Sequence, residues 1–327
     1  MQNENKRIMW IIRVQIICTF FITFSHSFSS KMSNPIWVEY AVELSQNFAL
    51  CSFMFISGFL ANTTEQLHKY GYLSYLKRRA KRLLIPYFIT QLLMLFPKFL
   101  LDSSKEKYTI KSIVLGFFFP RESILPHLWF LVALFLLCVL LPVFDRIVKN
   151  RILTIVSSIV FTLFVFLPHI SNFMCVNDIK QYLIWFFLGI VFSEYKLVSL
   201  IKNYILCSAL FFSSYVFLAT LYLKSGYLIF IIVLNFISIL LIISLALSLE
   251  RVNRLLDLGK YTMTIFILSL PAQNIIEILC IRYGLNLLLQ TILMLVTGLI
   301  IPIVIGRTVL KLHNKTIREC LKVLIGL

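Results

Sequence analysis

The stretch IMWIIRVQIICTFFITFSHSF, residues Ile8 to Phe28, decides how the fold is interpreted. About twenty mostly apolar residues suffice to cross the hydrocarbon core of a bilayer as a helix. This stretch has that length, so it predicts a first membrane-spanning helix. Lys6 and Arg7 precede it as in a secretory signal, but no small-x-small cleavage site follows, and we therefore expect the helix to remain uncleaved.

Three polar side chains interrupt this apolar run, namely Arg13, Gln15 and His26. Polar groups are costly in hydrocarbon, so they usually face the protein interior or a wet cavity and are candidates for function. At about 100° per residue, Gln15 and His26 fall on one helix face and Arg13 falls nearly opposite. Structural alternatives stay open: Arg13 can extend to the cytoplasmic headgroups, and His26 can bond a loop at the outer interface.

The whole chain has the composition of a polytopic membrane protein. Of its 327 residues, 60% are hydrophobic and 14% are charged, and the mean hydropathy is +0.91. A soluble globule could not keep so much apolar surface out of water. The net charge of +17 could indicate that the protein binds nucleic acid. In membrane proteins, however, basic residues collect in cytoplasmic loops beside anionic lipid. We therefore expect the bilayer and its anionic lipids as partners, and no nucleic acid.

Apolar runs of bilayer length, separated by charged residues and by clusters of Pro, Asn and Ser, predict about ten transmembrane helices. The predicted spans are residues 8–28, 40–61, 83–101, 128–144, 152–170, 179–194, 203–223, 226–249, 262–281 and 287–310. Most Lys and Arg residues fall in alternate segments that begin with the amino terminus, which places both termini in the cytoplasm. The predicted fold is all-α, a multi-pass protein of the inner (cytoplasmic) membrane, with residues 1–327 forming a single domain.

Cysteine usage predicts neither a disulfide framework nor a zinc site. The chain has seven cysteines and no Cys-x-x-Cys pattern, and most of the seven fall in predicted spans. We therefore expect no metal.

A basic stretch, YLKRRAKRLLIPY from Tyr75 to Tyr87, lies between the second and third predicted spans. As a positive-inside anchor, it would contact anionic lipid. As a phosphate-binding cluster, it would use Arg79 and Arg82, because residues three apart share a helix face and arginine grips phosphate bidentately. Arg78 lies beside this pair, and the spacing permits either interpretation.

Other predicted spans and one loop carry shorter sequence motifs. Ser57 and Gly58, in the stretch FMFISGFL, indicate close packing against a neighbouring helix. The fourth span opens with Pro-His127-Leu-Trp129 at the outer face, where tryptophan commonly anchors in the interface. His127 would then lie on the same side of the membrane as His26. Asp102 to His127 is a long outer loop that either covers a binding site or only connects two spans.

The ninth predicted span carries Gln273, Asn274 and Glu277. Residues three and four apart on a helix share a face, so Asn274 and Glu277 either face a polar cavity or pair with another helix. Gln273 lies beside them.

Taken together and in this order, these stretches resemble the acyltransferase-3 family of integral membrane acyltransferases, which O-acetylate bacterial surface sugars. The resemblance covers nearly the whole chain: the early helix with a histidine near its outer end, then FMFISGFL, YLKRRAKRLLIPY, HLWFL and LGKYTMTIFILSLP. It implies an enzyme that transfers an acyl group, usually acetyl from acetyl-CoA, to a hydroxyl of a glycan at the far face, with no prosthetic group.

The resemblance also implies catalytic residues. His26 matches the family's catalytic histidine, and a neutral imidazole can take a proton from a sugar hydroxyl as it attacks. The family has a basic residue eleven positions earlier, where this chain has Gln15, and Arg13 is the nearby cation. Ser269 stands where the family commonly has a histidine. The candidate catalytic residues are therefore His26, Gln15 and Arg13.

The resemblance also implies residues that bind the acyl donor and the acceptor. Arg79 and Arg82 match the arginine pair that the family associates with the acyl donor, and Arg78 adds a third cation. His127 and Trp129 would shape the site of the glycan acceptor.

The alternative from another class is a carrier or export component for a glycan or lipid-linked sugar, which would use the same polar cavity without acyl chemistry. Such carriers often show two matched halves with interrupted helices. We find no convincing pair of matched halves in this sequence. A scaffold without a site would explain the basic loops but not His26.

Overall fold

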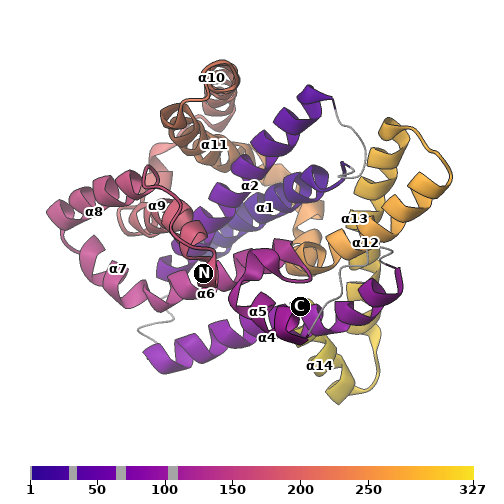
Figure 1. Ribbon diagram of the computed structural model, residues 1–327. Helices are drawn as coiled ribbons and strands as arrows, with labels where there is room; N and C mark the ends of the chain where they lie inside the picture. The colour runs from indigo at the N-terminus through magenta and orange to yellow at the C-terminus, as the bar shows by residue number, and fades with distance from the viewer. Residues whose placement is uncertain (1, 29–34, 64–70, 102–109) are drawn as a thin grey trace. The chain divides into compact units, whose positions relative to one another are not determined.

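The computed structural model describes residues 2–28, 35–63, 71–101 and 110–327 (Figure 1). All regular structure in these residues is helical. The α-helices are α1 Gln2–Ser25, α2 Ile36–Thr63, α4 Tyr72–Leu101, α5 Ile110–Phe118, α6 Trp129–Val139, α7 Leu141–Val148, α8 Arg151–Phe164, α9 Val176–Glu194, α10 Tyr204–Ser225, α11 Leu228–Ser248, α12 Thr262–Arg282, α13 Leu287–Lys311 and α14 Lys315–Ile325. The predicted all-α class is confirmed.

Within the described residues, 6 helices are long and apolar enough to cross a membrane, and a bent pair raises the number to 7. The pair is Pro126–Val139 with Leu141–Val148, which meet at 54°. This supports a multi-pass membrane protein. In the described part of the chain, fewer helices meet the length and hydropathy expected of a span than the ten predicted, and the number of crossings stays a prediction. The predicted span 152–170 overlaps α8, whose 14 residues rise only about 21 Å, short of the hydrocarbon thickness of about 30 Å. The apolar part of α1, Met9–Ser25, is also short.

Contacts group the chain into two compact units, which we describe separately. The first unit holds residues 1–56 and 196–318. In it, α10 pairs with α11 and α12 pairs with α13, while α1 contacts α11, α12 and α13 (Figure 1). Asn203 and Asn286 cap the amino termini of α10 and α13 by accepting hydrogen bonds from Leu206 N and Leu289 N. Because α1 is surrounded by several helices, its polar side chains Arg13, Thr19, Thr23 and Ser25 are buried in protein.

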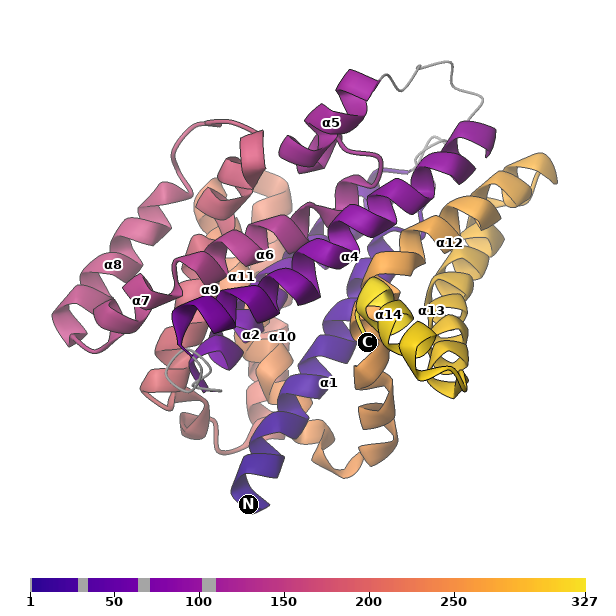
Figure 2. The ribbon, with the colours of Figure 1, turned by 90° about the horizontal axis from the view of Figure 1, so that it is seen from below.

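The second unit holds residues 57–195 and 319–326. Here α4 runs along α6, and α9 packs against α6, α7 and α8 (Figure 2). The end of α2 in this unit meets the backbone of α9 at Gly58, where an added Cβ would lie 1.9 Å from the carbonyl oxygen of Phe186. The close helix approach that the Ser57-Gly58 pair predicts is therefore confirmed.

The segment predicted as a long loop, Asp102 to His127, is partly helical. Residues 102–109 lie outside the described set, and the remainder forms α5 followed by the short 3-10 turns Pro120–Glu122 and Pro126–Leu128. The apolar piece that interrupts the predicted loop accounts for α5, because a short apolar run gains stability by packing as a helix.

Candidate functional site

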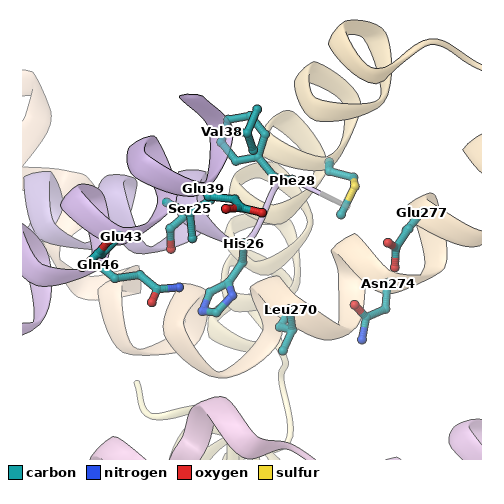
Figure 3. Close-up of a pocket in the computed structure, with 12 residues that line it drawn as sticks. Ser25, His26, Phe28, Val38, Glu39, Glu43, Gln46, Leu270, Asn274 and Glu277 are labelled. Atoms are coloured by element: carbon teal, nitrogen blue, oxygen red, sulfur yellow. The ribbon is translucent and has the colours of Figure 1, made fainter. Parts of the chain in front are cut away.

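A pocket of about 460 Å³ lies at the carboxyl end of α1 and contains His26 (Figure 3). This volume is within the range of small-molecule sites, about 300–1000 Å³. The polar lining comes from three helices and the turn after α1: Ser25, His26, Glu39, Glu43, Gln46, Asn274 and Glu277. Apolar lining residues are Phe28, Val38, Val42, Leu270 and Met294. A cavity of this size with both polar and apolar lining residues can hold a small polar molecule.

His26 lies in the turn that follows α1 rather than inside the helix, since α1 ends at Ser25. The turn stays close to helical geometry, because the His26 N–H donates to the carbonyl oxygen of Ile22 at 3.2 Å. The hydroxyl of Ser25 donates to the same carbonyl at 2.8 Å. The hydroxyl of Ser27 donates to the carbonyl of Thr23 at 2.8 Å. Hydrogen bonds on both sides of His26 therefore fix the backbone that carries the imidazole.

Gln273 of α12 ties this turn to the neighbouring helix. Its Nε2 donates to the carbonyl oxygen of Thr23 at 2.9 Å and to the Oγ of Ser27 at 3.0 Å. The side chain is fully buried, and Gly298 of α13 leaves room for it, since a Cβ there would lie 2.7 Å from Gln273 Nε2. Gln273 therefore holds the His26 segment from outside the pocket lining.

Two residues of α12 line the pocket as one of the two sequence interpretations predicts. Asn274 is exposed and Glu277 is buried, and both belong to the lining. The cavity interpretation of this polar group is confirmed for Asn274 and Glu277.

Three residues of α2 belong to the pocket although the sequence interpretation missed them. Glu39, Glu43 and Gln46 line it, and their spacing of i, i+4 and i+7 places them on one helix face. The hydroxyl of Tyr222 on α10 donates a short hydrogen bond to Glu43. Figure 3 shows Gln46 extending its amide toward the imidazole of His26. The signal was available, since three polar residues at helical spacing in an apolar span indicate a wet face.

Arg13 and Gln15 are not among the residues that line this pocket. Arg13 is 2% exposed and donates through Nη2 to the carbonyl oxygen of Glu250 at 2.9 Å. The alternative in which it extends to lipid headgroups is therefore wrong, because its guanidinium is buried in protein against the turn Leu249–Arg251 that follows α11. A cation there complements the free carbonyls of a helix carboxyl terminus. Gln15 is half-buried, and its catalytic role, like that of Arg13, stays a prediction.

The predicted donor-binding arginines lie in the first turns of α4, in the second unit. Arg78 and Arg82 are exposed and Arg79 is half-buried. The guanidinium of Arg79 lies over the Tyr75 ring, 5.2 Å from its centroid, and among the described residues its Nε has no hydrogen-bond partner. Part of the Arg82 side chain is exposed to solvent. The pKa of its guanidinium is lowered, mainly because surrounding protein desolvates it and to a smaller extent because of the positive charge of Arg79. Two cations that repel one another favour an anion between them.

His127 and Trp129 also lie in the second unit. His127 is half-buried in the turn Pro126–Leu128. Trp129 is 6% exposed, so the expectation of an interfacial anchor is wrong. The guanidinium of Arg121 covers it at 4.2 Å from the ring centroid, and Arg121 Nε donates to Asp178 Oδ1 at 2.9 Å. This cluster packs Trp129 against protein, and an acceptor role for His127 and Trp129 stays a prediction.

Comparison with known families gives one finding that covers most of the chain. A family model described as an acyltransferase domain, that of acyltransferase 3, matches residues 8–307. Comparison with curated proteins and with solved structures gives no match. The matched residues include the whole His26 pocket and the basic turns of α4.

Proposed function

The chain belongs to the acyltransferase 3 family, and on this premise we propose that it transfers an acetyl group from acetyl-CoA to a hydroxyl of a cell-surface or lipid-linked glycan. Family membership makes it an acyl-transferring membrane enzyme. The acetyl donor and the glycan acceptor are the proposed part. The observation that carries the proposal is His26 in the wall of a polar pocket of about 460 Å³ at the end of α1.

We propose that His26 acts as the general base. Its imidazole nitrogen takes the proton of the acceptor hydroxyl while the hydroxyl oxygen attacks the carbonyl carbon of the thioester. The new carbon–oxygen bond forms, the carbon–sulfur bond breaks, and the imidazolium returns its proton to the departing thiolate of coenzyme A. The hydrogen bonds around Ile22, Thr23 and Ser27 support this role, because general-base catalysis needs an imidazole in a fixed position.

We propose that Arg79 and Arg82 hold the phosphates of coenzyme A, with Arg78 as an additional cation. Two observations support this: the two guanidinium groups are close enough for the charge of Arg79 to lower the pKa of Arg82, and the Nε of Arg79 has no hydrogen-bond partner among the residues that the structure describes. Arginine suits phosphate because its planar group donates two parallel hydrogen bonds.

For the membrane, we propose the cytoplasmic membrane, with both termini inside and the basic segments against anionic lipid. The distribution of Lys and Arg supports this orientation. Ten crossings would require α1, α4 and α8 to cross in addition to the 7 candidate spans that are counted when the bent pair forms one span.

Incorporation of radiolabelled acetyl from acetyl-CoA into membrane glycan tests the proposal. Membranes that hold wild-type protein should label glycan, and membranes with His26→Ala at the same level should show a loss of at least a hundredfold, the usual range for a general base. His313→Ala, an exposed histidine, is the matched control and should keep full activity. A carrier without acyl chemistry would bind glycan without consuming acetyl-CoA, and that result would overturn the proposal.

A further inference from the structure

We propose that α14, Lys315–Ile325, lies in the plane of the membrane surface, with its apolar side in lipid and the lysines around its start at anionic headgroups. The inference deepens the proposed placement of the basic segments against anionic lipid, and it rests on that part of the proposed function. It adds which segment binds lipid and which of its sides does so.

The sequence of α14 makes a helix with two different sides. At about 100° per residue, its apolar and polar residues separate onto opposite sides. A helix with one apolar side and lysines on the other lies between headgroups and acyl chains, with its apolar side buried about 5–10 Å. The apolar side consists of Ile317, Cys320, Leu321 and Leu324, and the polar side of Lys315, Glu319 and Lys322.

Protein leaves the apolar side of α14 partly uncovered. Ile317 is 52% exposed, and Cys320 is exposed as well. Leu321 and Leu324 are half-buried. Removing apolar surface from water is favourable, so lipid that covers this side would stabilise α14 in place.

A break in the chain after α13 lets α14 take a new direction. The candidate span α13 ends at Lys311, and Leu312 has extended backbone angles, φ −62° and ψ 131°. Asn314 then starts α14, because its Oδ1 accepts a hydrogen bond from Ile317 N at 3.1 Å. Lys315 follows Lys311 so closely in sequence that the two Cα atoms are at most about 14 Å apart. The start of α14 therefore lies near the end of a candidate span.

The far end of α14 returns to a similar level of α13. A Cβ added at Gly306 would lie 3.6 Å from Cδ1 of Leu327, and both residues belong to the first unit. Gly306 stands between the exposed apolar side chain of Ile305 and the exposed cation Arg307, and such a change marks the passage from hydrocarbon to headgroups. With both ends near this level, α14 runs along the membrane surface.

The charge around the junction of α13 and α14 favours anionic lipid over neutral lipid. Arg307, Lys311 and Lys315 are cations at this junction, and all three are exposed. Lys322 pairs with Glu319 at 3.0 Å, which offsets its charge. Each Lys or Arg beside an anionic surface strengthens binding about fivefold, so Lys311 and Lys315 together should favour the lipid-bound position of α14 by roughly thirtyfold.

Cys320 is a natural probe on the apolar side. Cys207 is half-buried, and the remaining cysteines are buried, so a Cys207→Ser background leaves Cys320 as the reactive thiol. The full chain is labelled there with bimane and placed in phosphatidylglycerol nanodiscs, where lipids with a nitroxide on the acyl chain should quench the fluorescence strongly. The matched control carries Glu319→Cys and Cys320→Ser, which moves the probe to the polar side, and its quenching should be several-fold weaker.

Exchange of the lipid tests the preference for anionic headgroups. In phosphatidylcholine nanodiscs the ratio of quenched to unquenched probe at Cys320, read from fluorescence lifetimes, should fall at least tenfold. A Lys311→Gln, Lys315→Gln double variant in phosphatidylglycerol should show the same fall. Lys196→Gln with Lys202→Gln removes two exposed lysines between α9 and α10 and should leave the ratio unchanged.

Equal quenching of the two probes, or no quenching at Cys320, overturns the inference. The second result would mean that water, the chain itself or a second copy covers this side of α14. A ratio that neither phosphatidylcholine nor the double variant lowers also overturns it, because the charge of the lipid then plays no part.

The quenching measurement needs neither donor nor acceptor, so its failure is distinguishable from failure of the proposed function. Acetyl transfer without lipid contact at Cys320 would leave the proposed acetyltransferase intact and refute the placement of α14. Lipid contact without acetyl transfer would support the placement and refute the acetyltransferase.

Discussion

Replacing Gly298 by alanine should destabilise the protein, although alanine is the better helix former. The added Cβ would lie 2.7 Å from Nε2 and 2.9 Å from both Cδ and Cγ of Gln273, so this side chain has to move. Its two hydrogen bonds, to Thr23 O and Ser27 Oγ, contribute about 1 kcal/mol each. Against this loss of about 2 kcal/mol, the helix gains about 1 kcal/mol when alanine replaces glycine. The net expected destabilisation is about 1 kcal/mol.

Thermal unfolding in detergent, followed by loss of the monodisperse chromatographic peak, measures this change. The Gln273→Ala background is the decisive control, because removing the Gln273 side chain removes the three close atoms. In that background Gly298→Ala should stabilise by about 1 kcal/mol, which gives a coupling energy of about 2 kcal/mol between the two positions.

The same variant tests whether Gln273 positions His26. A displacement of about 1 Å in a catalytic group can cost about a hundredfold in rate, so Gly298→Ala should lower acetyl transfer at least tenfold with little change in the KM for acetyl-CoA. If Gly298→Ala stabilises the wild-type protein, or if the two substitutions act additively, the close packing of Gln273 against α13 is refuted.

Three further predictions concern the second unit. Gly58→Ala should lower the stability by about 3 kcal/mol, because its Cβ would meet a backbone oxygen that cannot move away; an unchanged unfolding temperature contradicts this. Arg121→Ala should cost about 1.5–3 kcal/mol by leaving the buried Asp178 carboxylate without its partner, and Asp178→Asn in the same background should recover part of the loss, whereas no recovery contradicts the pairing. Arg82→Ala should raise the KM for acetyl-CoA about tenfold with kcat nearly unchanged, while the control Lys81→Ala should change that KM far less. Equal effects of the two substitutions would indicate that the basic stretch only anchors the protein to anionic lipid.

The helices themselves follow from the sequence, because long apolar runs bounded by charge can only be buried as helices in a membrane. Close packing at Gly58 also follows, because small residues in an apolar helix allow a neighbouring helix to approach. For Asn274 and Glu277 the sequence left a cavity and a helix pairing open, and only the fold places both residues in a pocket wall. The number of spans does not follow in the same way. The bend between α6 and α7 and the short length of α8 depend on tertiary packing that hydropathy does not record.

The candidate site was only partly predictable for a related reason. His26 stands out as a histidine near the end of an apolar run, but its partners come from α2 and α12, which are distant in sequence. Arg13 shows the limit most clearly. Its position near the start of a span suggests lipid headgroups, and only the fold reveals that its guanidinium bonds the turn Leu249–Arg251 after α11. Burial of Trp129 beneath Arg121 is likewise a tertiary contact.

Chemical rescue of the His26→Ala variant tests the central claim most directly. The variant removes the imidazole from a pocket of about 460 Å³, which leaves space for free imidazole to enter. Purified His26→Ala protein in nanodiscs should transfer acetyl at least a hundredfold more slowly than wild type, and added imidazole should restore part of the rate, while Arg82→Ala should gain nothing. Transfer by His26→Ala at the wild-type rate without imidazole would contradict the assignment of His26 as the base.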